Sequence, residues 1–558
     1  MVSKARRARV SRRERQQGND RMNDKQIEKL LDDLAAGARR GTVSRRTFME
    51  GALATGATVA GASALWGTKV AAQTPKRGGT YRVGCHDGNT GDSMDPGLYQ
   101  AVYEIQLAHC HRSYLTEITA DGSVGPDIAQ SWSATPDATE WRFELFPNVE
   151  FHSGKKMTSE DVVASLNHHR GEDTTSAAKS LLADVTDIKA DGDNAVVITL
   201  ASGSADLPYL LTDYHLVICP ANPDGTIDWA SMDGTGPYKI ENHEPGVGTE
   251  MTRHEAYHRE GLAWFDAVRM VALNDPNARQ SAVLTGEVDA ITEADLKTVG
   301  LMGRNPNIKI VEVASGAHAT IPMFCDTAPF NDVNVRMALK YAIDRQDIVD
   351  KILFGHGSLG NDNPIGPSLP YYHEIEQRTF DPDRARFHLR EAGMENLSVE
   401  LSTSQAAFSG AIDMAVLFQE TARQCGIEIN VRREPNDGYW SDVWLVKPFV
   451  VVQWGARPTP DVMFSLAYRE GADWNESRWA NERFNQLLLE AKAELDDAKR
   501  AEMYAEMQML VHDDGGTIVP FFRNRVNVMS TALGAPEQQA GNWELDGARS
   551  YQRWWFNS

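Results

Sequence analysis

The chain has 558 residues, of which 42% are hydrophobic and 24% are charged. This balance is ordinary for a globular protein, but the length exceeds what one hydrophobic core supports, so we expect two or three domains. The net charge is −22, and because the first 72 residues carry 15 Lys/Arg and 7 Asp/Glu, residues 73–558 carry −30. Phosphate backbones repel so acidic a body, which excludes nucleic acid as a partner.

Residues 1–72 have the pattern of an export signal. Arg45-Arg46 resembles the twin-arginine motif, and the uncharged run from Gly51 to Thr68 is too weakly apolar to remain in a bilayer. Val70-Ala71-Ala72 supplies small residues for cleavage. We therefore predict a twin-arginine-type signal peptide with a long n-region, and a periplasmic protein without a lipid anchor. No other stretch is apolar enough to cross a membrane.

The first half of the body alternates short strands with turns. Thr158-Ser-Glu-Asp161 matches a capping box in front of an apolar helical stripe, which predicts a helix that begins at Thr158. Trp141, Phe143 and Leu145 alternate with polar residues, which predicts a half-buried strand. The other elements expected here are a strand at 78–84, a turn at 92–96, a strand at 195–200 and a glycine-rich turn at 234–238.

The second half alternates helices with strands. After Asn331, the residues Val335, Leu339 and Ile343 form one helical stripe, and Asp332 is the expected N-cap. The elements expected further on are a loop at 355–370, strands at 398–402, 428–432, 449–454 and 517–523, and helices near 411–425 and 482–513. This alternation predicts an α/β fold.

The loop after the strand at 449–454 is the first candidate binding site. One glycine and two prolines between residues 455 and 461 exclude both a helix and a hydrogen-bonded strand. We therefore expect a loop whose polar side chains are accessible to a ligand. In open α/β sheets, ligands bind beyond the carboxyl ends of strands. Trp454 and Arg457 together suit an organic solute with a negative charge. The alternative is that Trp454 is core and that Arg457 pairs with Asp461.

Seven blocks of sequence carry a resemblance to a known family. They are GGTYRVG (78–84), Ser93–Pro96, Pro126–Trp132, FHSGKKMTSEDVVASLN (151–167), Gly234–Tyr238, Pro329–Asp332 with VRMALKYAIDR (335–345), and the loop after Trp454. In this order they resemble the family-5 extracellular solute-binding proteins of ABC importers, the group that binds dipeptides, oligopeptides and nickel. The blocks extend over nearly all of residues 78–530.

The resemblance implies a two-lobed periplasmic-binding-protein fold of the large class, in which lobes joined by two crossing segments trap a ligand. Lobe I would comprise residues 73–317 and 518–558, with a subdomain at about 118–235, and lobe II residues 318–517. The crossings would fall near Ser315–Pro322 and Gly516–Phe521. The implied function is that of the periplasmic substrate-binding component of an ABC importer. We expect a monomer that is not an enzyme, with an inner-membrane permease as its partner.

The resemblance also bears on the ligand. In peptide-binding members, this loop carries an aspartate that pairs with the amino terminus of the peptide, and the matching position here is Arg457. Because the charge is reversed, we expect a peptide or peptide-like acid whose carboxylate meets the arginine. An opine or a metal–carboxylate chelate, such as a nickel chelate, is the alternative. Asp461 recovers an amine contact if the loop shifts.

Five further residues are weaker candidates for the binding site. Tyr99, Trp440 and Trp474 offer flat walls for a peptide-like ligand, with structural packing as the alternative. Asn363 lies in the loop where peptide-binding relatives contact the far end of the ligand. His318 stands at the first crossing, where a solvated hinge residue is the alternative.

Two other classes of function compete with a solute binder. A secreted hydrolase is disfavoured because the sequence has no Gly-x-Ser-x-Gly elbow and no His-Glu-x-x-His, so no catalytic residue is assigned. A metal or haem carrier is disfavoured because His109-Cys110-His111 lacks a third ligand, and His168-His169 has a solvated helix end as its default role. The five cysteines include no Cys-x-x-Cys pair. We expect no metal and no cofactor.

Overall fold

The structure, a computed structural model, describes residues 75–436 and 438–557. The chain divides into two units, and the larger one consists of Arg77–Ala535 and Gln539–Phe556. The smaller unit consists of Met1–Lys76, Pro536–Gln538 and Asn557–Ser558, and its described amino-terminal part is strand β1, Pro75–Lys76. The predicted export signal lies outside the described residues.

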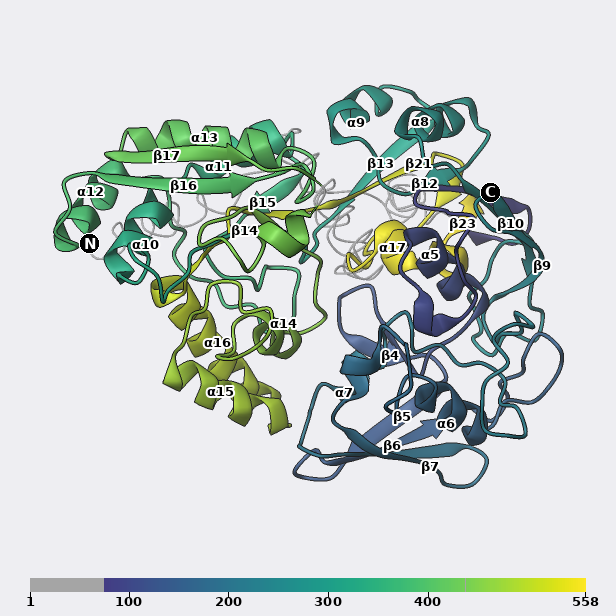
Figure 1. The fold of residues 1–558 in the computed structure, drawn as a ribbon. Coiled ribbons are helices and arrows are strands. Elements are labelled where there is room, and N and C mark those ends of the chain that lie inside the picture. The colour runs from purple at the N-terminus through teal and green to yellow at the C-terminus, as the bar shows by residue number, and fades with distance from the viewer. Residues whose placement is uncertain (1–74, 437, 558) are drawn as a thin grey trace, which may run out of the picture. The chain divides into compact units, whose positions relative to one another are not determined.

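A seven-stranded sheet collects strands from both ends of the larger unit, in the order β13-β21-β12-β2-β11-β10-β9. Its strands are β2 (Thr80–Cys85), β9 (Tyr238–Glu244), β10 (Gly248–Arg253), β11 (Ala267–Ala272), β12 (Ala290–Ile291), β13 (Ile308–Val313) and β21 (Arg525–Ser530). Strand β2 runs parallel to β11 and β12, and the other pairs are antiparallel. Tyr81 and Val83 are buried, which confirms the predicted first strand. Figure 1 shows β21, in yellow, beside β13.

Short helices and a small strand pair accompany this sheet. The helices are η1 (Pro96–Leu98), α5 (Val102–His111), α8 (Pro276–Thr285), α9 (Leu296–Met302), α17 (Glu544–Ala548) and α18 (Ser550–Arg553). The strand pair is β22 (Leu533–Gly534) with β23 (Trp555–Asn557). Tyr551 and Trp554 from α18 and its end pack against Tyr81, so the carboxyl terminus completes the core under β2.

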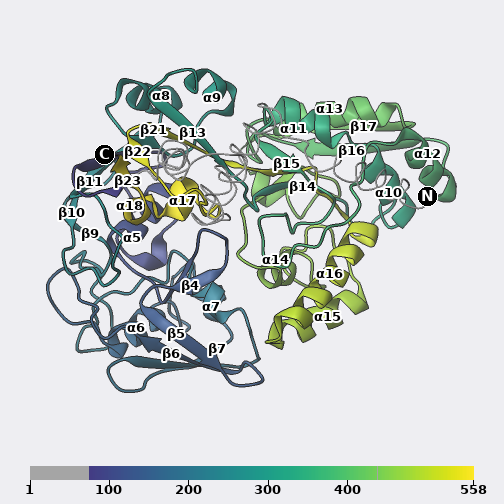
Figure 2. The ribbon, with the colours of Figure 1, turned by 180° about the vertical axis from the view of Figure 1, so that it is seen from behind.

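A four-stranded antiparallel sheet forms between residues 129 and 200, in the order β5-β6-β8-β7. The elements of this region are β3 (Thr116–Ile118), β4 (Val124–Pro126), β5 (Ala129–Ala134), β6 (Glu140–Leu145), α6 (Ser159–Asn167), η2 (Lys179–Leu182), β7 (Val185–Ala190), β8 (Ala195–Leu200) and α7 (Leu207–Leu210). The capping box is confirmed, because the Thr158 N–H donates to Asp161 Oδ2 at 2.9 Å. Figure 2 shows α6 against this sheet.

Residues 318–523 build a second centre of packing around a five-stranded antiparallel sheet, β15-β20-β14-β18 with β19 on β14. Its strands are β14 (His318–Pro322), β15 (Gly357–Leu359), β18 (Val452–Trp454), β19 (Thr517–Ile518) and β20 (Phe521–Arg523). A parallel pair, β16 (Leu397–Thr403) and β17 (Ile427–Arg433), lies along α13, as Figure 1 shows.

Helices and one π-helical turn accompany these strands in the second centre. They are α10 (Val333–Tyr341), α11 (Arg345–Ile352), α12 (Pro382–Glu391), α13 (Ala411–Arg423), η3 (Tyr439–Val443), α14 (Pro460–Ala467), α15 (Glu482–Ala493) and α16 (Asp497–Asp514). Asp332 caps α10 as predicted, because its side chain accepts a hydrogen bond from Asn334 N at 2.8 Å. Helices α15 and α16 pack side by side in Figure 2.

Three predicted elements were too long. The predicted strand at 449–454 is regular only at Val452–Trp454, because Phe449 bridges Met323 while Val450 bridges Ser402. The predicted helix at 482–513 breaks before Asp496, which caps α16. The predicted strand at 517–523 divides into β19 and β20, since Pro520 stands between them and has no N–H for a ladder.

The chain passes between the seven-stranded and five-stranded sheets twice. Residues 314–317 join β13 to β14, and Asn524 joins β20 to β21. Two such passages are what a two-lobed fold with a double crossing requires. Across the described part of the chain, no helix combines the length and apolar character that a membrane span needs.

Candidate ligand-binding site

A cavity of about 780 Å³ opens in the larger unit, a size suited to a small organic molecule. Segments far apart in sequence line it, from α7 and the residues that follow, from the first passage, and from the loop after β18. Its charged lining residues are Asp184, Asp213, Arg457, Asp461, Arg469, Lys492 and Arg525. Three residues predicted from sequence line this cavity: Arg457, Asp461 and Trp474.

The backbone after β18 explains how Arg457 and Asp461 are held. Thr459 is the N-cap of α14, and its Oγ1 accepts a hydrogen bond from Val462 N at 3.4 Å. Pro460 follows at the first helical position, where a missing N–H leaves no bond unmade. Asp461 therefore belongs to the first turn of a helix, and the expected loop is shorter than predicted. Arg457 stays on the loop, in residues 455–458.

Arg457 offers a positive charge to the cavity. Its guanidinium carbon lies 5.6 Å from the centre of the Trp454 ring, and Nη1 donates a long hydrogen bond of 3.5 Å to Gly455 O. Among residues 75–436 and 438–557, no carboxylate lies within 4.0 Å of it, Asp461 included. Burial lowers the pKa of Arg457, and the nearby Asp213 and Tyr214 oppose that effect. A guanidinium in this state is suited to a ligand carboxylate, which would bind it in bidentate fashion.

Asp461 offers a carboxyl group with different neighbours. The residue is 6% exposed, and within the described chain its Oδ1 has no hydrogen-bond partner. Burial raises the pKa of Asp461 from its ordinary 3.8 to about 7, with a further contribution from Asp206. Asp206 itself accepts a hydrogen bond from Arg500 at 2.7 Å and another from Thr459 Oγ1. Arg457 and Asp461 thus face separate electrostatic surroundings.

Two tryptophans donate hydrogen bonds to the buried carboxyl group of Glu476, and one of them, Trp454, lies under Arg457. Glu476 accepts hydrogen bonds from Trp454 Nε1 at 3.1 Å, Trp444 Nε1 at 2.9 Å and Thr320 Oγ1 at 2.7 Å. Burial raises the pKa of Glu476. The Trp474 ring lies 5.9 Å from that of Trp454 and is 40% exposed. Trp454 is thus a buried support on which Arg457 stacks, while Trp474 forms part of the wall.

The other predicted residues lie outside the cavity lining. Trp440 is half-exposed and packs edge-on against Trp444. Tyr99 is fully buried, where its hydroxyl accepts a hydrogen bond from Arg112 at 2.7 Å. The structure therefore gives Tyr99 a packing role.

Asn363 and His318 are also buried away from the lining. Asn363 donates to Gln508 Oε1 at 3.1 Å and fixes its own turn. His318 lies 2.9 Å from Gly316 O through Nδ1 and is 1% exposed, so the interpretation as a solvated hinge residue was wrong. Burial lowers the pKa of His318 to about 4.

Sequence reasoning missed the residues that complete the surroundings of Arg457. The Tyr214 ring lies 5.5 Å from that of Trp543 and 4.1 Å from that of His215. Asp213 Oδ1 lies 2.6 Å from His215 Nδ1. No local pattern marks these residues, because they meet Arg457 only through the fold.

The histidines weighed as metal ligands have other partners. His168 Nε2 lies 2.7 Å from Asp95 Oδ1, and His169 is fully buried with its Nδ1 2.7 Å from Ser176 Oγ, so the solvated default was wrong for His169.

His109 Nδ1 lies 2.8 Å from Ile105 O and His111 Nδ1 lies 2.7 Å from Leu107 O, both within α5. In the part of the chain that the structure describes, no three His, Cys, Asp or Glu side chains are grouped to hold a metal ion.

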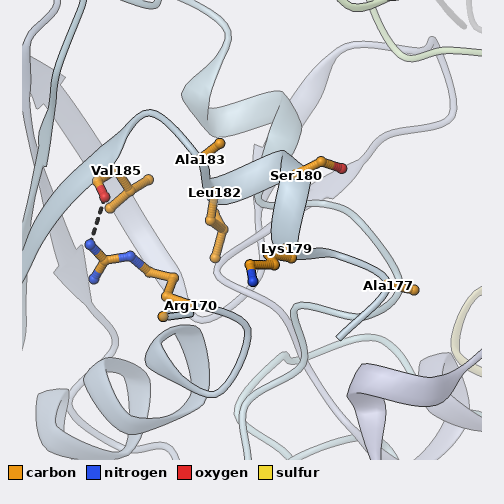
Figure 3. Close-up of a pocket in the computed structure, with 8 residues that line it drawn as sticks. Arg170, Ala177, Lys179, Ser180, Leu182, Ala183 and Val185 are labelled. Atoms are coloured by element: carbon orange, nitrogen blue, oxygen red, sulfur yellow. Dashed lines mark hydrogen bonds between the residues drawn. The ribbon is translucent and has the colours of Figure 1, made fainter. Parts of the chain in front are cut away.

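A second cavity, of about 480 Å³, lies beside η2 and is drawn in Figure 3. The two cationic side chains that line this cavity donate hydrogen bonds to nearby backbone carbonyl groups. Arg170 Nη2 donates to Val185 O at 2.6 Å, the dashed line in Figure 3, and Lys179 Nζ donates to Glu172 O at 3.0 Å. These contacts explain Arg170 and Lys179 as residues that stabilise the local fold, without a ligand.

Two sheet-centred parts, two passages between their sheets and a cavity lined from both define a two-lobed periplasmic-binding-protein fold. The comparisons agree. Residues 123–476 match the family described as bacterial extracellular solute-binding proteins, family 5 middle. The chain belongs to this family, the substrate-binding proteins of ABC importers.

Relatives within the family are distant in sequence. Haem-binding protein A of Haemophilus influenzae is 24% identical over 70% of this chain and 77% of its own. The dipeptide-binding protein of Escherichia coli is 22% identical over 77% of this chain and 85% of its own. The solved structure of AgaA with agropinic acid, from A. tumefaciens R10, has a TM-score of 0.68 at 21% identity and covers 86% of this chain and 99% of its own.

Proposed function

We propose that this protein captures a small peptide or peptide-like acid in the 780 Å³ cavity and delivers it unchanged to an ABC permease of the inner membrane. The two lobes would follow the predicted boundaries, with residues 73–317 and 518–558 in lobe I and residues 318–517 in lobe II. Export by the twin-arginine-type signal would place the mature protein in the periplasm. We expect it to act there as a monomer.

The observation that carries this proposal is the guanidinium of Arg457. It stacks on Trp454, which holds it in place, and it has no carboxylate within 4.0 Å in the described residues. A ligand carboxylate would compensate its charge in a partly desolvated setting, where charge-assisted hydrogen bonds are strong. Trp474 and Tyr214 supply flat surfaces for the rest of the ligand.

The same arginine supports a second candidate, an opine or a metal–carboxylate chelate. The relative of similar fold that holds agropinic acid gives this alternative its weight. All these ligands share a carboxylate, so the contact with Arg457 is common to them. These candidate ligands differ in the part of the molecule beyond the carboxylate.

Mass spectrometry of whatever co-purifies with the protein from its native periplasm would identify the ligand. Calorimetric titration of the stripped protein with that compound should then give an affinity at least tenfold weaker for Arg457→Ala, because one charge-assisted hydrogen bond contributes about 1.5–3 kcal/mol. Arg423→Ala removes an exposed charge on α13 and is the matched control. Equal affinities for wild type and Arg457→Ala would remove Arg457 from the site, and chemical conversion of the compound would point to a hydrolase.

A further inference from the structure

One face of helix α14 borders the cavity along the length of the helix. Asp461, Ser465 and Arg469 follow one another at intervals of four residues, and all three line the cavity. Residues four apart lie on the same side of a helix. Arg469 stands just after the carboxyl end of α14, where its N–H donates to Phe464 O at 2.8 Å and closes the last turn. The cavity therefore follows α14 from Arg457, before the helix, to Arg469, after it.

Two of the cations that line this cavity have no acidic partner within the described residues. The lining cations are Arg457, Arg469, Lys492 and Arg525. Lys492 Nζ lies 2.8 Å from Asp184 Oδ2, and Arg525 Nη1 lies 2.8 Å from Glu544 Oε1. Across residues 75–436 and 438–557, no carboxylate lies within 4.0 Å of the guanidinium group of Arg457 or of Arg469. Because the body of the chain is strongly acidic, two such cations beside one cavity favour a ligand with more than one anionic group.

We propose that the ligand carries two anionic groups and that Arg469 binds the second of them, at the other end of α14 from Arg457. This inference rests on the proposed function, which assigns the first group to Arg457, and it narrows the ligand class to elongated dianions. With eight residues at about 1.5 Å each, the helix between the two arginines is about 12 Å long. A peptide-like acid of about three residue lengths matches that separation, since an extended chain covers at most about 3.6 Å per residue.

The exposure of Arg469 determines both the size of the expected effect and the measurement that isolates it. An exposed charge pair changes an equilibrium constant by up to about fivefold. A cation that follows a helix also stabilises the carbonyl groups of the last turn. That second role affects the stability of the fold and does not depend on the charge of a ligand. The test therefore compares ligands that differ by one carboxylate.

Three probes of nearly equal size make this comparison. N-succinyl-L-alanylglycine carries a carboxylate at each end. N-butyryl-L-alanylglycine has a methyl group in place of the succinyl carboxylate, and N-succinyl-L-alanylglycinamide has an amide in place of the glycine carboxylate. Titration calorimetry at low ionic strength, where screening is weak, measures the affinity of the stripped protein for each probe. Wild type should bind the dianion about fivefold more tightly than the better of the two monoanions.

Three variants assign this preference to individual arginines. Arg469→Gln should remove the preference for the dianion and leave the affinity for the better monoanion unchanged. Arg390→Gln is the matched control and should keep the wild-type preference, because Arg390 is exposed in the last turn of α12 and has no ion pair within the described residues. Arg457→Ala should weaken the binding of the dianion and of the better monoanion alike.

The outcomes separate this inference from the proposed function. Equal wild-type affinities for the three probes, or a preference that survives Arg469→Gln, overturn the second anion contact, and a loss of affinity in Arg457→Ala then still supports the first. If Arg457→Ala changes no affinity while Arg469→Gln removes the preference, the contact at Arg457 fails and the contact at Arg469 stands. If no probe binds, the peptide-like ligand class and the inference built on it are both overturned.

Discussion

Arg500 is the residue whose replacement should most disturb the region around the cavity. On α16 it donates to Asp206 Oδ1 at 2.7 Å, to Tyr371 OH at 3.1 Å, to Tyr504 OH at 3.2 Å and to Ala491 O at 3.2 Å. Its guanidinium carbon also lies over two aromatic rings, at 5.1 and 5.4 Å from their centres. One side chain thus joins α16 to the N-cap of α7.

Arg500→Met keeps the aliphatic stem and removes the charge and the donors. Asp206 would then stay buried without its ion-pair partner, next to the carboxyl group of Asp461. Removing one partner of a buried ion pair costs about 3–5 kcal/mol, mostly because the remaining charge is uncompensated. Asp206→Asn in the Arg500→Met background removes that charge. The double variant should therefore be more stable than the sum of the single effects predicts, with a coupling of about 1–3 kcal/mol.

Urea unfolding followed by tryptophan fluorescence measures the free energy of unfolding of the four proteins in this cycle. Arg483→Met is the matched control, because its bidentate contact with Glu506 joins α15 to α16 at the surface, with side chains 47% and 44% exposed. That pair should contribute less than about 1 kcal/mol. A cost for Arg500→Met no larger than for Arg483→Met, or strict additivity with Asp206→Asn, would refute the reasoning.

Two shorter predictions concern other parts of the chain. Glu476→Ala leaves two buried donors and one partly buried donor without an acceptor and should lower the free energy of unfolding by about 3 kcal/mol in the same urea assay, whereas the exposed Glu502→Ala should have little effect. Replacing Arg45-Arg46 with Lys-Lys should leave the full-length precursor in the cytoplasmic fraction, whereas the same change at Arg12-Arg13 should not; periplasmic recovery of the first variant would contradict a twin-arginine signal.

The elements that could be predicted from sequence are those fixed by near neighbours. The helix at Thr158 and the cap at Asp332 rest on hydrogen bonds across two or three residues, and both were right. The strand at 449–454 was too long because its residues pair with partners on either side, Met323 and Ser402, which no local pattern reveals. Only the complete sheet decides where such a strand stops being regular.

The candidate site divides in the same way. Arg457 was predicted from its place after a buried strand and lines the cavity, as does Trp474. Tyr99 was chosen only because an aromatic ring suits a ligand, and its ring is equally suited to a core, where it lies. Asp206 and Arg500 are 294 residues apart in sequence, so their pairing could not be foreseen without the fold.

The different surroundings of Arg457 and Asp461 depend on a single local feature, the start of α14 between them. Thr459 ends the loop by capping the helix and also donates to Asp206, so it ties the loop to the segment that carries α7. Residues before the cap then face Asp213 and Tyr214, and residues after it face Asp206 and Arg500. Residues 455–458 precede the buried cap, so we expect substitutions among them to change which ligand charges are accepted while Thr459 and the helix that it caps keep their packing. We therefore expect the loop-to-helix boundary at Thr459 to set the ligand preference of this chain.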